Sequence, residues 1–135
     1  MRKLMMMLCY LSFVPAVWAA APYDGSVPLL CATLRIQECG NDSGECHPRR
    51  AEEVNIPQFV KIDVAQKTIS STGAESRQAA VQRLENTDGR LVLQGGQGGR
   101  GWSMVIATET GQMSASVVDE EVGFVIFGSC TPLPK

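Results

Sequence analysis

Residues 90–106 read RLVLQGGQGGRGWSMVI, and this stretch decides the fold of the chain. Two short apolar runs, at 91–93 and 102–106, flank a segment rich in glycine. Strands favour β-branched and aromatic residues, whereas glycine favours tight turns. We therefore predict two antiparallel strands joined by a glycine-rich turn, with Trp102 entering the core just after the turn.

Outward from this stretch, apolar and polar residues alternate in several more segments that end at turn residues. We expect further strands over residues 29–37, 59–64, 68–72, 112–118 and 122–129. Residues 77–85 have good helix propensity, but their apolar stripe is too thin for a helix, so a strand is favoured and a helix stays the alternative. Residues 49–54 are expected to make one helical turn that ends before Pro57.

The segment 29–37 alternates most clearly, and it predicts one buried face. The residues expected on that face are Leu30, Ala32, Leu34 and Ile36. Their neighbours along the chain are then expected to face outward, because side chains alternate across a strand.

These segments together predict an all-β fold of about eight short antiparallel strands. Short turns and the absence of a long crossover favour an up-and-down meander that forms a small barrel or a flattened sandwich. Closure of the sheet would make the first and last strands neighbours and would remove exposed edges.

The N-terminus has the pattern of a secretory signal peptide. Arg2 and Lys3 precede an apolar run over residues 4–17, and small alanines follow it. A membrane span needs roughly 20 apolar residues, which this run does not reach. We predict a signal peptide over residues 1–19, a single β domain over residues 20–135, no membrane span after cleavage, and a periplasmic or secreted location.

Four cysteines remain once Cys9 leaves with the signal peptide, and an even number in an exported chain indicates disulfides. Three pairings are open. We favour Cys39–Cys46, which closes a short loop of easily bent residues, and Cys31–Cys130, which would tie the first strand to the last.

A metal site is the alternative use of the loop at residues 39–48. Cys39, Cys46 and His47 would supply the ligands, but zinc sites usually space their cysteines two to four residues apart. The oxidising compartment also favours the disulfide. We therefore predict no metal at this loop.

Charge argues against nucleic acid as a partner. Loss of two of the 12 basic residues with the signal leaves ten against 14 acidic residues, a net charge near −4. Binding to a phosphate backbone needs clustered lysine and arginine, and the only adjacent pair is Arg49-Arg50.

Residues 96–101 match the pattern G-x-G-x-x-G, but a dinucleotide-binding site needs a helix after these glycines, and strand-like residues follow instead. We interpret the segment as a hairpin tip. Gln97, Arg100 and Trp102 are the candidate contacts to a ligand or partner at a barrel mouth. A single histidine and the absence of a G-x-S-x-G motif predict no catalytic residues and no cofactor.

Three long segments carry a resemblance: IPQFVKIDVAQKTI (56–69), GRLVLQGGQGGRGWSMVIATETGQM (89–113) and GFVIFGSCTP (123–132). With the cysteines, they resemble a family of small exported proteins of proteobacteria. The resemblance covers nearly the whole mature chain and implies a bacterial, periplasmic protein. That family has no established activity, so no residue inherits a role.

The overall plan is also similar to periplasmic lysozyme inhibitors, which are small disulfide-tied β-barrels. Their inhibitory loops carry a Ser-Gly-x-x-Tyr segment, and this chain has none. The similarity therefore concerns the fold alone.

We carry three functional hypotheses forward. The first is a non-enzymatic periplasmic binding or inhibitor-type domain whose partner is an unknown envelope protein. The second is a calycin-like carrier of a small ligand, which needs an open cavity and would be eliminated if four large side chains filled the barrel: Trp102, Met104, Phe124 and Phe127. The third is an enzyme that uses two carboxylates.

Overall fold

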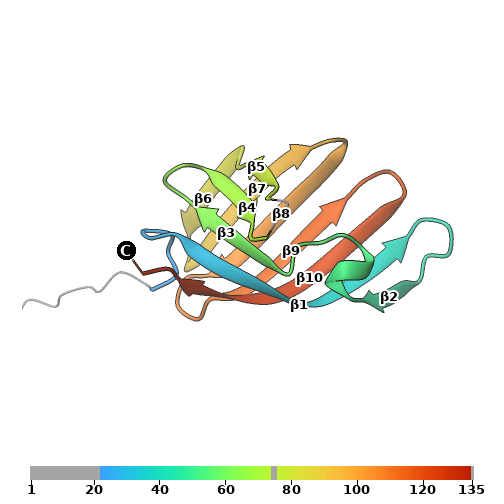
Figure 1. The fold of residues 1–135 in the computed structure, drawn as a ribbon, viewed down its shortest axis with the longest axis horizontal. Coiled ribbons are helices and arrows are strands. Elements are labelled where there is room, and N and C mark those ends of the chain that lie inside the picture. Colours follow the sequence, from blue (N-terminus) through green and yellow to red (C-terminus); the bar gives the residue numbers. More distant parts are fainter. Residues whose placement is uncertain (1–21, 74–75, 135) are drawn as a thin grey trace, which may run out of the picture.

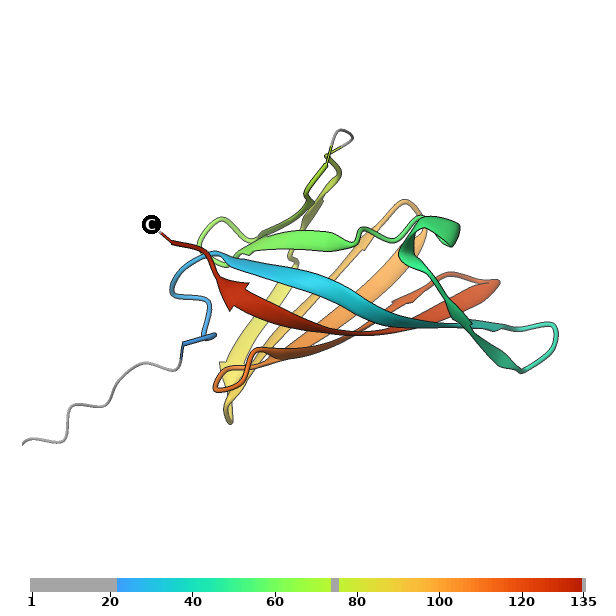
Figure 2. The ribbon, with the colours of Figure 1, turned by 60° about the horizontal axis from the view of Figure 1, so that its bottom comes forward.

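The computed structural model describes residues 22–73 and 76–134. In this part of the chain, ten strands form one antiparallel sheet that curls into a half-barrel (Figure 1, Figure 2). The all-β class is therefore confirmed. The signal peptide expected over residues 1–19 lies outside the described residues, and its cleavage stays a prediction. Among the residues described, no helix has the length and apolar character needed to cross a bilayer.

The strands are β1 (Leu29–Gly40), β2 (Cys46–Arg49), β3 (Phe59–Asp63), β4 (Thr68–Ser71), β5 (Gln78–Ala80), β6 (Arg83–Thr87), β7 (Arg90–Gln97), β8 (Arg100–Ala107), β9 (Gln112–Val118) and β10 (Val122–Pro132). One 3₁₀ turn, η1 (Ala51–Glu53), lies between β2 and β3 and confirms the helical turn expected there.

The strand order is β5-β4-β3-β1-β10-β9-β8-β7-β6, with β2 paired to β1 outside this path. Apart from β2, neighbours in the sheet are either consecutive in the chain or are the first and last strands. The up-and-down meander is therefore confirmed, and so is the pairing of the first strand with the last. The ladder between β1 and β10 runs from Leu29↔Pro132 to Gly40↔Val122.

The two ends of the sheet are β5 and β6, which are consecutive in the chain. Val81 donates its N–H to the carbonyl of Lys67, and Gln82 donates its own to the carbonyl of Gln94 in β7. The chain therefore passes from one edge of the sheet to the other within two residues. The strand predicted over residues 77–85 is real but is interrupted here, because the two halves pair with opposite edges.

Both predicted disulfides are present. Cys31 lies opposite Cys130 in the β1–β10 ladder, and both are buried. Cys39 lies opposite Cys46 in the β1–β2 ladder. The segment expected as a pinned loop is thus a hairpin, and β2 with the split at Val81 raises the strand number from about eight to ten.

The predicted buried face of the first strand is confirmed at Ile36 but is wrong at Leu34. A register shift between Thr33 and Arg35 places one extra residue in β1, and Leu34 is 66% exposed. Leu29 is fully buried before the shift, and Ile36 is buried after it. A bulge of this kind moves the remaining side chains of the strand to the opposite face.

The glycine-rich turn is tighter than predicted. β7 and β8 continue through most of the segment, and only Gly98 and Gly99 lie between them. Their φ angles are 60° and 80°, and two-residue hairpins that match the strand twist require positive φ at both positions.

Six large side chains are fully buried, and the chain segment that precedes β1 packs beside them. The largest fully buried side chains are Leu29, Ile62, Leu91, Leu93, Ile106 and Cys31. The lead-in segment packs beside them, because Tyr23 donates its N–H to the carbonyl of Thr108 and Gly25 lies against Val64. One aromatic residue considered for the interior does not reach it, since Phe127 is 40% exposed.

Candidate functional site

A cavity of about 610 Å³ lies inside the curl of the sheet. We call it the inner cavity. Its apolar wall comes from β3, β4 and β5 on one side and β8, β9 and β10 on the other, and includes Val60, Ile69, Ala79, Met104, Ala115 and Ile126. Pockets for small organic ligands typically have volumes of roughly 300–1,000 Å³ and mostly apolar walls. The inner cavity therefore has the size and the lining of such a pocket.

The rim of the inner cavity is formed by three segments, each of which contributes at least one polar side chain. They are the loop at residues 55–57, the residues Arg77 and Gln78 at the start of β5, and the tip of the β7–β8 hairpin. Gln97, Arg100 and Trp102, the three candidate contact residues, all line the cavity. The hairpin tip thus lies beside the cavity, and its role as a ligand contact stays a prediction.

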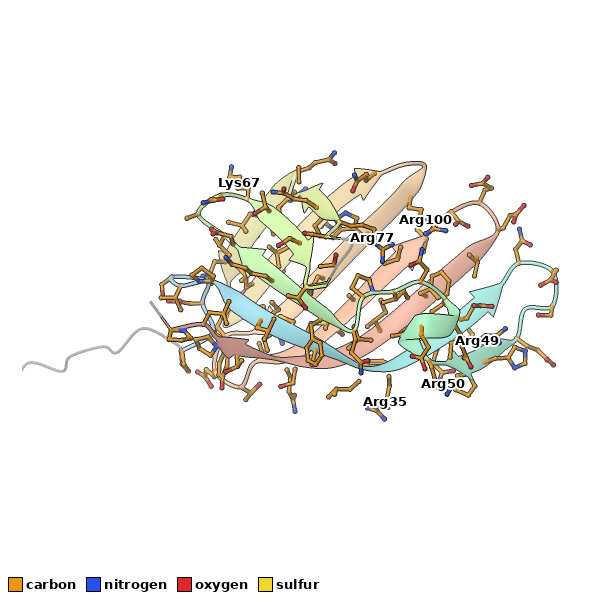
Figure 3. The ribbon with its side chains drawn as sticks, viewed as in Figure 1. Arg35, Arg49, Arg50, Lys67, Arg77 and Arg100 are labelled. Atoms are coloured by element: carbon orange, nitrogen blue, oxygen red, sulfur yellow. A yellow bond between two sulfur atoms is a disulfide. The ribbon has the colours of Figure 1, made fainter. Side chains whose placement is uncertain are left out.

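Two of the lining residues carry a formal charge, and both are arginines. Arg77 and Arg100 lie on the same side of the molecule and come from different parts of the sheet (Figure 3). No aspartate or glutamate among the described residues lines the inner cavity. The local electrostatic potential is therefore expected to favour an anionic group.

Arg100 is held by Asp119 in the turn between β9 and β10. The Nε of Arg100 donates to Oδ2 of Asp119 over 3.2 Å. The Oδ1 of Asp119 accepts the backbone N–H groups of Val122 and Glu121 at 2.9 and 3.0 Å. These backbone bonds, and secondarily Arg100, hold the pKa of Asp119 below its ordinary value. The carboxylate is therefore ionised at neutral pH and fixes the arginine at the rim.

Arg77 is positioned mainly by uncharged groups. Its Nη2 donates to the carbonyl of Asn55 over 3.0 Å, and its backbone N–H donates to the hydroxyl of Ser71. It forms no ion pair with a described carboxylate. A guanidinium group has five N–H donors, so this arrangement leaves donors of Arg77 for an anion.

Trp102 forms part of the cavity wall and is only partly buried. Its indole ring lies against Gly95 of the neighbouring strand, where an added Cβ would come within 2.5 Å of the ring atom Cζ2. Glycine at 95 is therefore needed for this close approach. The indole N–H is covered but has no hydrogen-bond partner among the described residues.

Sequence reasoning missed Arg77 and the loop at residues 55–57. Neither belongs to a recognisable motif, and they are brought to the hairpin tip only by the curl of the sheet. His47, the alternative metal ligand, lies exposed on β2, 3.8 Å from Glu45. No group of three or more His, Cys, Asp or Glu side chains suited to a metal occurs in the described part of the chain.

The half-barrel and its inner cavity define the class: a disulfide-bonded all-β protein with a cavity inside its curled sheet. Comparison with family models, with curated proteins and with solved structures finds no match for this chain. The resemblance to exported proteobacterial proteins accordingly stays a prediction.

Proposed function

We propose that this protein is a non-enzymatic, exported binding protein that takes a small, mainly apolar ligand into the inner cavity. The observation that carries the proposal is the open volume of about 610 Å³ within the sheet. A small-ligand carrier requires that four large side chains leave the interior of the sheet open, and they do so here. Trp102 and Met104 form its wall, whereas Phe124 is packed in the core and Phe127 is on the outer face.

The apolar wall supports uptake by the hydrophobic effect. Each buried methylene contributes about 0.8 kcal/mol, so ten of them contribute about 8 kcal/mol before the costs of association are subtracted. Because a micromolar affinity corresponds to about 8 kcal/mol of net binding free energy, a chain of ten methylenes should bind more weakly than micromolar by this contribution alone.

The chemistry of the site supports binding rather than catalysis. An enzyme based on two carboxylates needs both acids on one pocket, and no described acid lines the inner cavity. The histidine on β2 is not among the lining residues either. The third hypothesis therefore gains no support from this site.

A neutral fluorescent probe tests the proposal directly. N-phenyl-1-naphthylamine emits strongly only in apolar surroundings, and we expect saturable binding to one site per chain. Ala115→Leu adds bulk to the cavity wall from β9 and should weaken this binding. Its matched control is Ser114→Leu, one residue earlier on the same strand, where the side chain lines a groove on the outer face with Phe127.

Absence of saturable probe binding in the wild type would overturn the proposal. It would also fail if Ala115→Leu and Ser114→Leu bound the probe equally well while both kept the wild-type melting temperature. Melting curves are needed for both variants, because added volume in a packed region can destabilise by about 1–3 kcal/mol.

Protein binding is a second candidate, favoured by a separate observation. Leu34, Val125 and Phe127 are 66%, 40% and 40% exposed, and the ladder places the last two on the outer face of β10 beside β1. Exposed apolar clusters often mark interaction surfaces. Capture of a specific envelope protein that is lost in Phe127→Ser but kept in Arg100→Ala would favour this function over ligand uptake.

A further inference from the structure

The rim and the wall of the inner cavity differ in character, and the difference indicates a ligand class. We infer that the ligand is a single-chain anionic amphiphile, with its acidic head group at Arg77 and Arg100 and its chain in the apolar interior. This inference rests on the proposed function and specifies the chemistry of the same cavity.

The distribution of charge is the first argument. The chain as a whole has more acidic than basic residues, 14 against 12. The charged residues that line the cavity are nevertheless both arginines, and none of its described lining residues is acidic. Both charged side chains that a ligand in the cavity can meet are therefore cationic.

The second argument is the hydrogen-bonding capacity that remains on the two arginines. The Nε of Arg100 is occupied by Asp119, and one Nη of Arg77 is occupied by the carbonyl of Asn55. The remaining N–H donors of both side chains can bind head-group oxygens without loss of these contacts. Arginine is well suited to carboxylate and phosphate oxygens because its planar donors match their geometry.

The size of the cavity favours one chain. The volume of about 610 Å³ lies in the middle of the range typical of pockets for single small organic ligands, roughly 300–1,000 Å³. That accommodates a chain of about 12 carbons with its head group, whereas a two-chain lipid is considerably larger. The apolar wall also argues against a free inorganic anion, which would lose its hydration without gaining partners in the interior.

Displacement of bound N-phenyl-1-naphthylamine tests the inference. The competitors are dodecanoate, dodecyl phosphate, dodecanol and dodecyltrimethylammonium, each below its micelle concentration. We expect both anionic chains to displace the probe at concentrations about tenfold lower than the neutral or the cationic chain, because contacts to charged groups are worth more than a factor of ten. Inorganic phosphate alone should not displace the probe.

Charge-neutral variants locate the head group. Arg77→Gln should weaken binding of dodecanoate about five- to tenfold and leave dodecanol unchanged. Arg35→Gln is the matched control, because Arg35 lies 5.5 Å over the ring of Phe127 and points away from Arg77 and Arg100 (Figure 3).

The outcomes separate the two proposals. If the wild type does not bind the probe at all, the proposed function fails. If the probe binds but all four chains compete equally, or if Arg77→Gln with a wild-type melting temperature binds dodecanoate normally, the anionic head group is refuted while ligand uptake stands. Displacement by inorganic phosphate alone would refute the requirement for a chain. Should Arg77→Gln unfold, Arg77→Lys must retain the preference for anionic chains, and its loss would count against the inference.

Discussion

Gly95→Ala is the most informative single change in this protein, because it acts on the contact between two strands and on the cavity wall at once. A methyl group at 95 would come within 2.5 and 2.7 Å of the indole atoms Cζ2 and Cε2 of Trp102, and within 2.8 Å of the carbonyl oxygen of Ala80. Carbon atoms are not found at such separations, so either the ring or the backbone must move.

The loss of stability in Gly95→Ala depends on how far the ring of Trp102 can move away from the new methyl group. Overpacking a well-packed region costs typically about 1–3 kcal/mol. Replacement of glycine by alanine also restricts the unfolded chain, which stabilises by about 0.4–1 kcal/mol where the site tolerates the methyl group. The ring borders open space and can tilt into the inner cavity, so we expect a net loss of about 1–2 kcal/mol, at the lower end of the overpacking range.

Gly101→Ala is the matched control. Its nearest neighbour would be Cγ2 of Val118 at 3.9 Å, which is an ordinary contact. Both variants replace a strand glycine by alanine, so the restriction of the unfolded chain is the same in both. Urea unfolding followed by circular dichroism should therefore give a lower midpoint for Gly95→Ala and an unchanged or higher one for Gly101→Ala.

The same pair of variants tests the cavity. A ring displaced by the methyl group at 95 should reduce binding of N-phenyl-1-naphthylamine, while Gly101→Ala should bind it normally. Equal unfolding midpoints for the two variants would refute the close approach between Gly95 and Trp102. A large loss of stability without any loss of probe binding would show that the strands, and not the ring, absorb the strain.

Three further changes have defined outcomes. Replacement of both Cys31 and Cys130 by serine opens a bridge between residues 99 apart, and the chain-entropy model gives a loss of about 5 kcal/mol, measurable as a shift of the urea midpoint. Phe124→Ala should cost about 3–5 kcal/mol because the side chain is buried, whereas Phe127→Ala should cost clearly less because it is on the outer face; equal losses would contradict the assigned faces of β10. Asp119 should titrate by NMR with a pKa below the ordinary aspartate value, and Arg100→Gln should raise that pKa only in part, since the backbone N–H groups are the larger cause of its lowering. Because its pKa is lower in the folded state, the stabilisation by this carboxylate is present above about pH 4 and is lost as pH falls through the folded pKa.

Local pattern was sufficient for most of the fold. Period-two alternation and turn residues located eight strand-forming segments. The Cys31–Cys130 pairing followed from the expectation that the first and last strands meet, and the Cys39–Cys46 pairing followed from the short loop between them. These features depend on residues close in sequence or on a single global closure. They can therefore be predicted from the sequence without knowledge of side-chain packing.

The bulge in β1 was not visible in the same way. Leu34 continues the apolar alternation, yet it is exposed because the strand inserts one residue between Thr33 and Arg35. Thr33 turns toward the loop before β3, donating its hydroxyl to the carbonyl of Pro57 and its N–H to that of Gln58. These partners lie about 24 residues away, so the shift is a tertiary effect that no local pattern encodes.

The candidate site also consists of a part that local sequence predicts and a part that depends on tertiary structure. Gln97, Arg100 and Trp102 lie on one hairpin, and the glycine-rich sequence at its tip was sufficient to predict them as candidate contacts. Arg77 begins the segment 77–85, for which a strand and a helix were both considered. It joins the site only because the curl of the sheet brings the start of β5 to the same cavity as the hairpin. A site made by closure of a sheet can be half predicted from sequence, because one wall is local and the other is not.

The ladder between β1 and β10 also constrains the order in which the molecule can assemble. The ribosome delivers the partner of β1 last, so the first strand must wait, unpaired on that edge, until almost the entire polypeptide has been made. During that interval Cys31 is a free thiol close in sequence to Cys39 and Cys46, either of which could capture it. The bridge between those two spans 7 residues against 99 for the other, so its loop closes at a lower entropic cost and we expect it to form first, which would leave Cys31 for its distant partner.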